Sequence, residues 1–425
     1  MHLSIKEDIV TYLREGEKKG YDLGLEIEHF VVDDNGMPIE FEELSGLIDE
    51  ICKRAGGEEL YTDNLLVGYT TEDYTITLEP SCQFEISIRP EQDLDVIEKI
   101  YGEFIKIWEP AFAKKGYKII TGGNLPKVEL GEITPDDIPL TKKLRYKYMD
   151  EYFQNTGKYG KYMMRASAST QISIDYSSEK DMILKLSLLQ KISPMLMIMM
   201  ENKVSKNSYL PGNTEKTHLL RIQEWDDLDK DRTGFYEDFL GSEFGYETLA
   251  EIIENTPLIL LTESGETISV GDSSVKDLIS EGKIDYENWD AARKNKLIEH
   301  SISMGFFHYR VKRYIEIRVA DSVPIKKAMA YVALIKGLMY SEESLKLLEL
   351  ELKSVDSVQK IEDATDKIER DGFDAIIYDG KSAEEWSNCL LDIAAKALSG
   401  DEKERLKYLR SFLYNLNIGS SQEGS

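Results

Sequence analysis

Four segments of this sequence alternate apolar and charged residues, and this alternation limits the possible folds more than any other feature. In a β-strand, successive side chains point to opposite faces, so residues two apart share a face and lie about 7 Å from each other. In the run Leu23–Val32, Leu25 and Ile27 share one face, and Glu26 and Glu28 share the other. The pattern therefore predicts a sheet with one apolar face and one charged face.

The same alternation recurs in the runs Tyr74–Ile88, Met163–Tyr176 and His308–Val319. An antiparallel sheet with one face on helices and the other in water produces a similar pattern, and that explanation suffices for any one strand. It explains the set less well, because a solvated face usually carries lysine, threonine and mixed polar residues. Here the shared faces carry carboxylates, amides and arginines, namely Glu26, Glu28, Glu79, Gln83, Glu85, Arg165, Gln171, Arg310, Glu316 and Arg318.

Several carboxylates that converge on one face raise each other's pKa unless a cation neutralises them. Oxygen ligands from separate strands are typical of magnesium, which usually also binds phosphate oxygens and water. The glutamates on or beside these strand faces are Glu26, Glu28, Glu79, Glu85 and Glu316. Arg165, Arg310 and Arg318 could each bind two oxygens of a phosphate or of a substrate carboxylate. This combination favours phosphoryl transfer from ATP, with Mg²⁺ as the metal.

Other nucleotide-binding and hydrolytic motifs are absent from the sequence. It contains no Walker A pattern, no kinase HRD and DFG pair, no HExxH and no GxSxG. With five histidines, the chain offers little material for a zinc site or a histidine-driven triad. His29 falls on the apolar face of its strand, where we expect a buried core residue and not a ligand.

The composition limits the class of partner. Of the 425 residues, 41% are hydrophobic and are spread along the chain, so a large core is available and disorder is not expected. The formal net charge of −27 repels nucleic acids and anionic membrane surfaces, so we expect small-molecule substrates. Three sparse cysteines, no secretory leader pattern and a longest apolar run of only Met195–Met200 indicate a cytoplasmic protein without a membrane span. We expect a monomer or a small homo-oligomer.

The elements expected along the chain indicate one α+β domain. Between the strand-like runs lie helical patterns, such as the apolar stripe of Leu94, Ile97, Tyr101, Phe104 and Trp108. After Pro324 the pattern is helical almost to the end. We therefore predict a catalytic core over residues 1–325, a helical segment over 326–418 that packs on the same domain, and a mobile tail over 419–425.

Six stretches, met in this order along the chain, carry a family resemblance. They are Gly24–His29 (GLEIEH), Leu78–Ser87 (LEPSCQFEIS), Arg145–Met149 (RYKYM), Met163–Ser173 (MMRASASTQIS), Asp229–Gly234 (DKDRTG) after Arg221 and Trp225, and Arg313–Arg318 (RYIEIR). Together they resemble glutamate–cysteine ligase of the plant and proteobacterial type, one of the carboxylate–amine ligases with a glutamine-synthetase-like fold. The resemblance covers about residues 20–345 and rests on the ordered set, because each stretch alone is a weak signal.

The resemblance implies a curved, mainly antiparallel sheet that forms a funnel, with helices packed outside it. It implies that the five glutamates named above are the magnesium carboxylates. The implied residues beside the nucleotide and metals are Gln83, Gln171, Lys230, Arg232 and Arg310. The implied glutamate ligands are Arg165, Arg221 and Trp225. The implied catalytic residues are Arg165, Glu316 and Arg318.

The implied reaction is an ATP-dependent ligation in two steps. The γ-carboxylate of glutamate attacks the terminal phosphate of ATP, and the amino group of cysteine then displaces phosphate from the γ-glutamyl phosphate. The chain departs from the family pattern at Ser81-Cys82, Gln223 and Ser173, where the family usually has Gly-Gly, His and Asn. These changes leave the acceptor open, so another amine is an alternative. A protein that binds nucleotide or amino acid without turnover, and a phosphotransferase on the related guanidino-kinase scaffold, are further alternatives.

Overall fold

One mainly antiparallel sheet forms the centre of the molecule. The computed structural model describes the chain except residues 1–3, 237–238, 242, 264–265 and 423–425. Within the described residues, nine strands form the sheet in the order β12-β13-β7-β1-β5-β4-β3-β2, with β6 paired to β1. All of these neighbours are antiparallel. The strands are β1 (Leu23–Asp33), β2 (Glu58–Thr62), β3 (Leu65–Thr70), β4 (Tyr74–Leu78), β5 (Phe84–Glu91), β6 (Tyr117–Ile120), β7 (Ser169–Ile174), β12 (Tyr309–Val311) and β13 (Ile315–Asp321).

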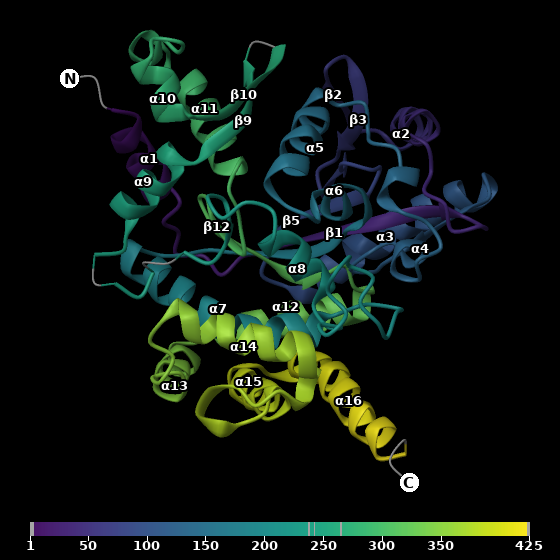
Figure 1. The fold of residues 1–425 in the computed structure, drawn as a ribbon, viewed down its shortest axis with the longest axis vertical. Helices are drawn as coiled ribbons and strands as arrows, with labels where there is room; N and C mark the ends of the chain where they lie inside the picture. The colour runs from purple at the N-terminus through teal and green to yellow at the C-terminus, as the bar shows by residue number, and fades with distance from the viewer. Residues whose placement is uncertain (1–3, 237–238, 242, 264–265, 423–425) are drawn as a thin grey trace.

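Two smaller sheets border the central one. β9 (Pro257–Glu263) and β10 (Glu266–Ser274) form an antiparallel hairpin, which Figure 1 shows near the top of the molecule. β8 (Thr233–Gly234) pairs in parallel with β11 (Phe306–Phe307). This short ladder holds the chain that follows helix α8 (Leu220–Asp226) beside the chain that leads into β12.

Long helices cover the apolar face of the central strands. α3 (Leu94–Lys114) packs on β5 and β6, α7 (Glu179–Met200) packs on β12 and β13, and α12 (Ile325–Met339) packs on β1 and α3. In Figure 1, α7 and α12 run below the sheet, with the remaining C-terminal helices beneath them. The predicted apolar stripe of α3 is buried throughout, and the Trp108 ring packs 4.6 Å from the ring of Phe84.

α7 is a core helix in this fold. Among the described residues it is the one helix with the length and apolar composition of a membrane span. However, 78% of its apolar window is buried inside the protein, where α7 contacts β13, α14 (Val358–Asp371) and α15 (Ala383–Ala397). The apolar surface of α7 is therefore used for packing within the chain.

The chain after Pro324 is mostly helical and ends in α16 (Gly400–Gln422). Lys336 of α12 pairs with Glu402 of α16 at 2.5 Å, and Arg405 of α16 pairs with Glu98 of α3 at 2.6 Å. These helices pack directly on the core. The predicted division into residues 1–325 and 326–418 stays a prediction. The predicted tail over 419–425 overlaps the end of α16, and its last three residues lie outside the described part of the chain.

The other described helices complete the layers around the sheet. They are α1 (Ile5–Arg14), α2 (Phe41–Ala55), α4 (Pro126–Glu129), α5 (Leu144–Thr156), α6 (Gly160–Ala166), α9 (Tyr246–Asn255), α10 (Val275–Ser280), α11 (Ala291–Ser303) and α13 (Glu342–Glu351), with short 3₁₀ turns at Pro135–Asp137, Tyr286–Asn288, Gly372–Asp374 and Tyr378–Gly380. The prediction of a mainly antiparallel sheet with helices packed outside it is confirmed.

Three details of the strand predictions are wrong. The run 163–176 is not one strand, because residues 160–166 form α6 and only Ser169–Ile174 form β7. Residues 160–166 contain Lys161, Met163, Met164, Arg165 and Ala166, which favour a helix, and they pack against α5, where a Cβ on Gly160 would lie 2.6 Å from the Phe153 carbonyl oxygen. The run 74–88 is two strands, β4 and β5, joined by a turn. The run 308–319 is also two strands, β12 and β13, which pair antiparallel with each other. The pattern also missed β2, β3, β9 and β10.

Candidate active site

A cleft of about 360 Å³ opens on the polar face of the central strands. Strand register explains why the predicted residues meet there, since Glu28 is paired with Glu85 across β1 and β5, and Glu26 with Gln171 across β1 and β7. Side chains at paired positions lie about 5 Å apart on the same face. The predicted residues that line the cleft are Glu26, Glu28, Glu79, Gln83, Glu85, Gln171, Trp225, Arg310, Glu316 and Arg318.

Burial leaves three of the cleft carboxylates poorly compensated. Burial and the neighbouring Glu79 raise the pKa of Glu28 to about 7. Burial and the charge of Glu316 raise the pKa of Glu26. Burial and the charge of Glu26 raise the pKa of Glu85 well above its usual range. A bound cation would offset both the cost of burial and the repulsion between the carboxylates, because it favours the ionised form of each carboxylate that it contacts.

Glu316 has the opposite shift. Burial alone would raise its pKa, but three nearby cations hold the pKa of the Glu316 carboxyl well below its usual range. Arg310 Nε donates to Glu316 Oε2 at 2.6 Å, and Lys312 Nζ donates to Oε1 at 2.8 Å. Arg318 Nη1 donates to Glu316 Oε2 at 3.2 Å and also to the side-chain carbonyl of Gln171. This end of the cleft therefore carries an excess of positive charge.

The donor set fits magnesium in its chemistry but does not form a closed metal centre. In the part of the chain that the structure describes, no group of three or more His, Cys, Asp or Glu side chains is arranged to hold a metal ion. The acidic and amide donors nevertheless share one cleft and offer the oxygen ligands that magnesium prefers. The uncompensated charge of the carboxylates is the observation that favours a cation here.

Hydrogen bonds from main-chain groups hold two of these side chains in place. The Gln83 amide accepts from Ser81 N at 2.7 Å and donates to the Ser167 carbonyl at 2.9 Å. The Glu28 carboxylate accepts from Ser169 N at 2.7 Å. These bonds tie β1 and the start of β5 to the chain that enters β7, so the donors of different strands keep a defined spacing.

The turn that joins β4 and β5 carries Glu79. Cys82 in this turn has φ 61°, the left-handed conformation that favours glycine, and the family pattern usually has glycine here. Thr141 Oγ1 donates to the Glu79 carbonyl at 2.7 Å, and Tyr146 OH donates to Glu79 Oε2 at 3.0 Å. Burial raises the pKa of the Cys82 thiol to about 12, so we interpret it as a packed side chain and not a reactive one.

α8 places Arg221 and Trp225 near Arg318. The Trp225 ring lines the cleft, 5.7 Å from the Arg318 guanidinium. Arg221 is only 4% exposed and is not a lining residue, and its Nη2 donates to the Arg318 carbonyl at 3.3 Å. Arg221 Nε and Nη1 and Trp225 Nε1 are buried without an acceptor among the described residues. The Arg221 charge lowers the pKa values of Glu28, Glu224 and Asp321, so it already has protein carboxylates nearby. Trp225 Nε1 is a buried donor on a residue that lines the cleft, and a bound anion such as a substrate carboxylate could accept from it.

The structure does not bring Arg165, Lys230 or Arg232 to the cleft. Arg165 lies on α6 and not on a strand, and its Nη2 pairs with Asp150 at 2.8 Å. Arg232 is fully buried, and it donates to Asp229 at 2.7 Å and to main-chain carbonyls. Lys230 lines a separate hollow of about 510 Å³ beside β8 and α14. Their predicted roles therefore have no support in this geometry.

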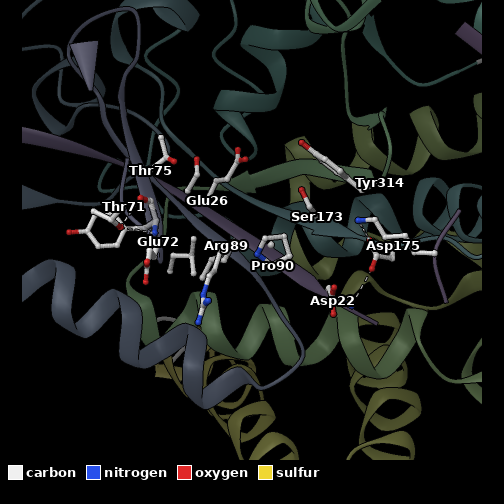
Figure 2. A pocket seen from close by; sticks show the side chains of 16 residues that line it. Asp22, Glu26, Thr71, Glu72, Thr75, Arg89, Pro90, Ser173, Asp175 and Tyr314 are labelled. Atoms are coloured by element: carbon white, nitrogen blue, oxygen red, sulfur yellow. Dashed lines mark hydrogen bonds and ion pairs between the residues drawn. The ribbon is translucent and has the colours of Figure 1, made fainter. Parts of the chain in front are cut away.

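The polar face continues past Glu26 into a second hollow of about 270 Å³. Figure 2 shows Glu26 and Thr75 at one side of this hollow, with Ser173 and Tyr314 on the other side. Glu26 lines both the cleft and the hollow, so the two spaces adjoin along β1.

Sequence reasoning missed several residues of the cleft. The lining residues without a predicted role include Arg145, Tyr146, Ser303, Phe306 and Lys312. Arg145 and Tyr146 open the RYKYM stretch, which the resemblance singles out without a function. Lys312 shares the charged face of its run with Arg310, and this signal could have found it. Ser303 and Phe306 lie between α11 and β12, where no local pattern marks them.

An antiparallel sheet whose polar face combines clustered carboxylates with arginines suits an enzyme that transfers a phosphoryl group from a nucleotide. Residues 22–420 match the model of glutamate–cysteine ligase family 2, and the chain belongs to this family. The prediction made from the six stretches is confirmed.

Relatives of this chain include plant enzymes. Over 343 residues the chain is 28% identical to the chloroplastic glutamate–cysteine ligase A of Oryza sativa subsp. indica. This alignment covers 80% of this chain and 68% of that protein. It is 26% identical over 354 residues to the chloroplastic glutamate–cysteine ligase of Arabidopsis thaliana, covering 81% and 64% of the two chains. The glutamate–cysteine ligase of Francisella tularensis, solved in complex with AMP, aligns over 94% of this chain and 83% of its own, with a TM-score of 0.53 at 13% identity. That likeness supports the fold.

Proposed function

We propose that this protein joins the γ-carboxylate of glutamate to the amino group of cysteine and converts ATP to ADP and phosphate. Family membership and the names of the relatives support the proposal. The observation that carries it is the division of the cleft into two charge environments. Glu26, Glu28 and Glu85 are undercompensated carboxylates, whereas cations crowd around Glu316. Phosphoryl transfer uses both, because carboxylates hold the metal and guanidinium groups neutralise the phosphates.

The cleft and the second hollow adjoin along β1 and together offer room for an extended ligand. We propose that the phosphates occupy the cleft and that the nucleoside occupies the hollow beside Ser173 and Tyr314. Glu26, at the junction, would hold magnesium together with the neighbouring glutamates, and magnesium when bound supplies positive charge to the phosphate oxygens.

The remaining side chains of the cleft suit the two chemical steps. Arg310 and Arg318, both oriented by Glu316, would bind the phosphoryl group as it moves from ATP to the γ-carboxylate. Trp225 would contact the α-carboxylate of glutamate, and Arg221, which donates to the Arg318 carbonyl, would support Arg318 where the γ-carboxylate meets it. The acceptor amine then attacks the γ-carbonyl and phosphate leaves. Positioning and charge do most of this work, so no covalent nucleophile is needed.

Cysteine remains the first candidate for the acceptor. The departures from the family pattern at Ser81, Cys82 and Gln223 are buried and do not line the cleft. Ser173 lines only the second hollow. These changes therefore do not directly alter the walls of the cleft where the acceptor would meet the γ-carbonyl.

The test is turnover with ATP, magnesium and glutamate against a panel of amines, followed by phosphate release and product mass. Wild-type protein should form γ-glutamylcysteine with cysteine. In Glu316→Gln we expect kcat/KM to fall at least about 100-fold, because the two arginines lose the carboxylate that orients them. The exposed Glu343→Gln, which removes one negative charge on α13, is the matched control.

Turnover with a different amine would keep the ligase class and replace the acceptor. Phosphate transfer to a stable acceptor without free phosphate would support the phosphotransferase alternative, and nucleotide binding without turnover would support a non-catalytic protein. A cytoplasmic location and a monomeric or small oligomeric state are further predictions, which cell fractionation and light scattering would test.

A further inference from the structure

One buried carboxylate of α8 has no role yet in the proposed reaction. Glu224 directly precedes Trp225 in α8, is fully buried and does not line the cleft. Glu224 Oε1 accepts from Asn124 Nδ2 at 2.8 Å and from Tyr209 OH at 2.7 Å, and Oε2 accepts from Asn124 Nδ2 at 3.0 Å. Both carboxylate oxygens are therefore used within the protein, so Glu224 is placed to hold α8 and not to bind a ligand.

A buried carboxylate is an unfavourable choice for packing alone. Burial raises the pKa of Glu224 to about 8, although hydrogen bonds from Tyr209 and Asn124 and the charge of Arg221 lower it. In the part of the chain that the structure describes, no cation forms an ion pair with Glu224. An apolar side chain of similar volume would fill the same space without a desolvated charge. The three bonds of Glu224 therefore need a reason beyond packing.

Asn124 belongs to a segment that holds Gln83. It forms an antiparallel β-bridge with Ser167, in the chain that leads from α6 into β7. The Ser167 carbonyl accepts from Gln83 Nε2 at 2.9 Å, and Ser167 and Gln83 both line the cleft. A continuous set of contacts thus runs from Glu224 through Asn124 and Ser167 to Gln83.

Tyr209 attaches Glu224 to the same part of the chain. The Tyr209 ring stacks on the Tyr162 ring of α6, with the ring centroids 5.8 Å apart. α6 runs directly into the chain that carries Ser167, and it also contacts α8. α8 itself has only seven residues, too few for a stable helix without contacts to the rest of the protein. The place of α8 in the fold therefore depends on attachments such as those of Glu224.

We propose that Glu224 is a positioning residue, which fixes α8 and Trp225 at a set distance from the wall of the cleft that carries Gln83. The proposed function places glutamate against Trp225 and the phosphates of ATP in the cleft, and the inference rests on that function for the identity of both substrates. The distance between the two walls then determines whether the γ-carboxylate reaches the terminal phosphate. A displacement of about 1 Å between reacting groups can lower a rate by about 100-fold.

The experiment uses Glu224→Leu, which keeps the approximate volume and removes all three bonds. We expect kcat for the ligation to fall about 10- to 100-fold, because the two substrates remain bound but are misplaced. The Kd values for ADP and for glutamate, measured separately by calorimetry with magnesium, should stay within about threefold of the wild type, because each ligand keeps its own contacts. Hydrogen exchange of the α8 amides, followed by mass spectrometry, should become faster, and this measurement needs no turnover.

Two further variants and a control separate positioning from a general loss of stability. Glu224→Gln keeps an oxygen that can accept from Asn124, so it should recover most of kcat. Asn124→Ala should reproduce the fall in kcat, and its combination with Glu224→Leu should add little, since both changes break the same link. Glu254→Leu removes a glutamate of α9 that is also buried and pairs with Lys276, and it should leave kcat and the exchange of α8 unchanged.

Three results would each overturn the inference. They are a wild-type kcat in folded Glu224→Leu, unchanged hydrogen exchange of α8 in that variant, and a loss of affinity for glutamate or ADP with unchanged kcat. If Glu224→Leu does not fold, Asn124→Ala decides by the same measurements. If the wild-type protein shows no turnover with any amine, the proposed function fails, while the hydrogen exchange of α8 still tests whether Glu224 holds this helix.

Discussion

Two glutamates of the same cleft have opposite pKa shifts, and the difference lies in their immediate neighbours. Glu316 is fully buried and Glu26 is half-buried, and the charge of Glu316 helps to raise the pKa of Glu26. Glu316 also has two arginines and a lysine within hydrogen-bond distance, which more than offset the cost of its burial. Glu26 has none of these bonds, so burial dominates. The chemistry of a carboxylate here depends on its immediate neighbours, which for Glu316 come from β12, from the chain between β12 and β13, and from β13 itself.

His300 should make the stability of the folded protein depend on pH. Burial is the main cause that lowers the pKa of His300 to about 4, and the ring contacts the Leu260 carbonyl at 2.8 Å. The folded protein therefore holds the neutral ring, and its contribution to stability is present above the unfolded pKa of 6.5. As the pH falls from 6.5 toward 4, this contribution of up to about 3 kcal/mol is lost.

The measurement is urea unfolding of wild type and His300→Gln across that pH range. The wild-type free energy of unfolding should fall more steeply than that of the variant, because only the wild type loses the histidine contribution. A difference between the two proteins that stays constant from pH 7.5 to pH 4 would contradict this reading.

At the scale of elements, two helices of the C-terminal segment pack unusually closely. A Cβ added to Gly337 of α12 would lie 2.8 Å from the Ala394 carbonyl oxygen and 2.9 Å from the Ala394 Cβ on α15. Distances this short require one helix to move. Gly102 of α3 has nothing within 4 Å of the same added atom. The close approach of α12 and α15 therefore requires glycine at position 337, whereas position 102 has room for a side chain, although both lie within helices.

The matched pair Gly337→Ala and Gly102→Ala separates packing from helix propensity. Alanine favours a helix over glycine by about 1 kcal/mol, so Gly102→Ala should stabilise the protein by about that amount. In Gly337→Ala, an overpacking cost of about 2 kcal/mol should exceed the same gain, for a net loss of about 1 kcal/mol. Chemical denaturation measures both, and stabilisation by Gly337→Ala would show that α12 and α15 can separate at little cost.

At the scale of the whole molecule, the C-terminal helices complete the core. All but three residues of α12 are buried, and the helix contacts β1, α3, α7, α15 and α16. The sheet that carries the active-site residues therefore has part of its apolar face covered by residues beyond the predicted boundary at 325.

We predict that a chain ending at Pro324 does not reach the native fold, because the apolar surface under α12 would meet water. Its far- and near-ultraviolet circular dichroism and its unfolding transition would report this. A chain ending at residue 418, which removes only the predicted tail, should unfold cooperatively with the midpoint of the full chain. Cooperative folding of the shorter chain would show that residues 1–325 are an independent domain.

Much of the site could be predicted because its information is local. A strand repeats every two residues wherever it lies, so the sequence alone determines that Glu26 and Glu28 share one face, opposite Leu25 and Ile27. The stripe of α3 follows from the helical period in the same way. The ordered stretches then indicated the family, which the family match confirms.

The rest was decided by contacts between distant parts of the chain. β13 and β1 both pair with β7, so their polar side chains line the same cleft. This strand order depends on packing over the whole sheet. Arg165 lies in a run whose alternating pattern predicts a strand, but the structure has a helix there, and Arg165 pairs with Asp150 of α5. Arg145 reaches the cleft through bonds to the β4–β5 turn, more than 60 residues away. Local periodicity determines which face a residue occupies, whereas long-range packing determines which faces meet.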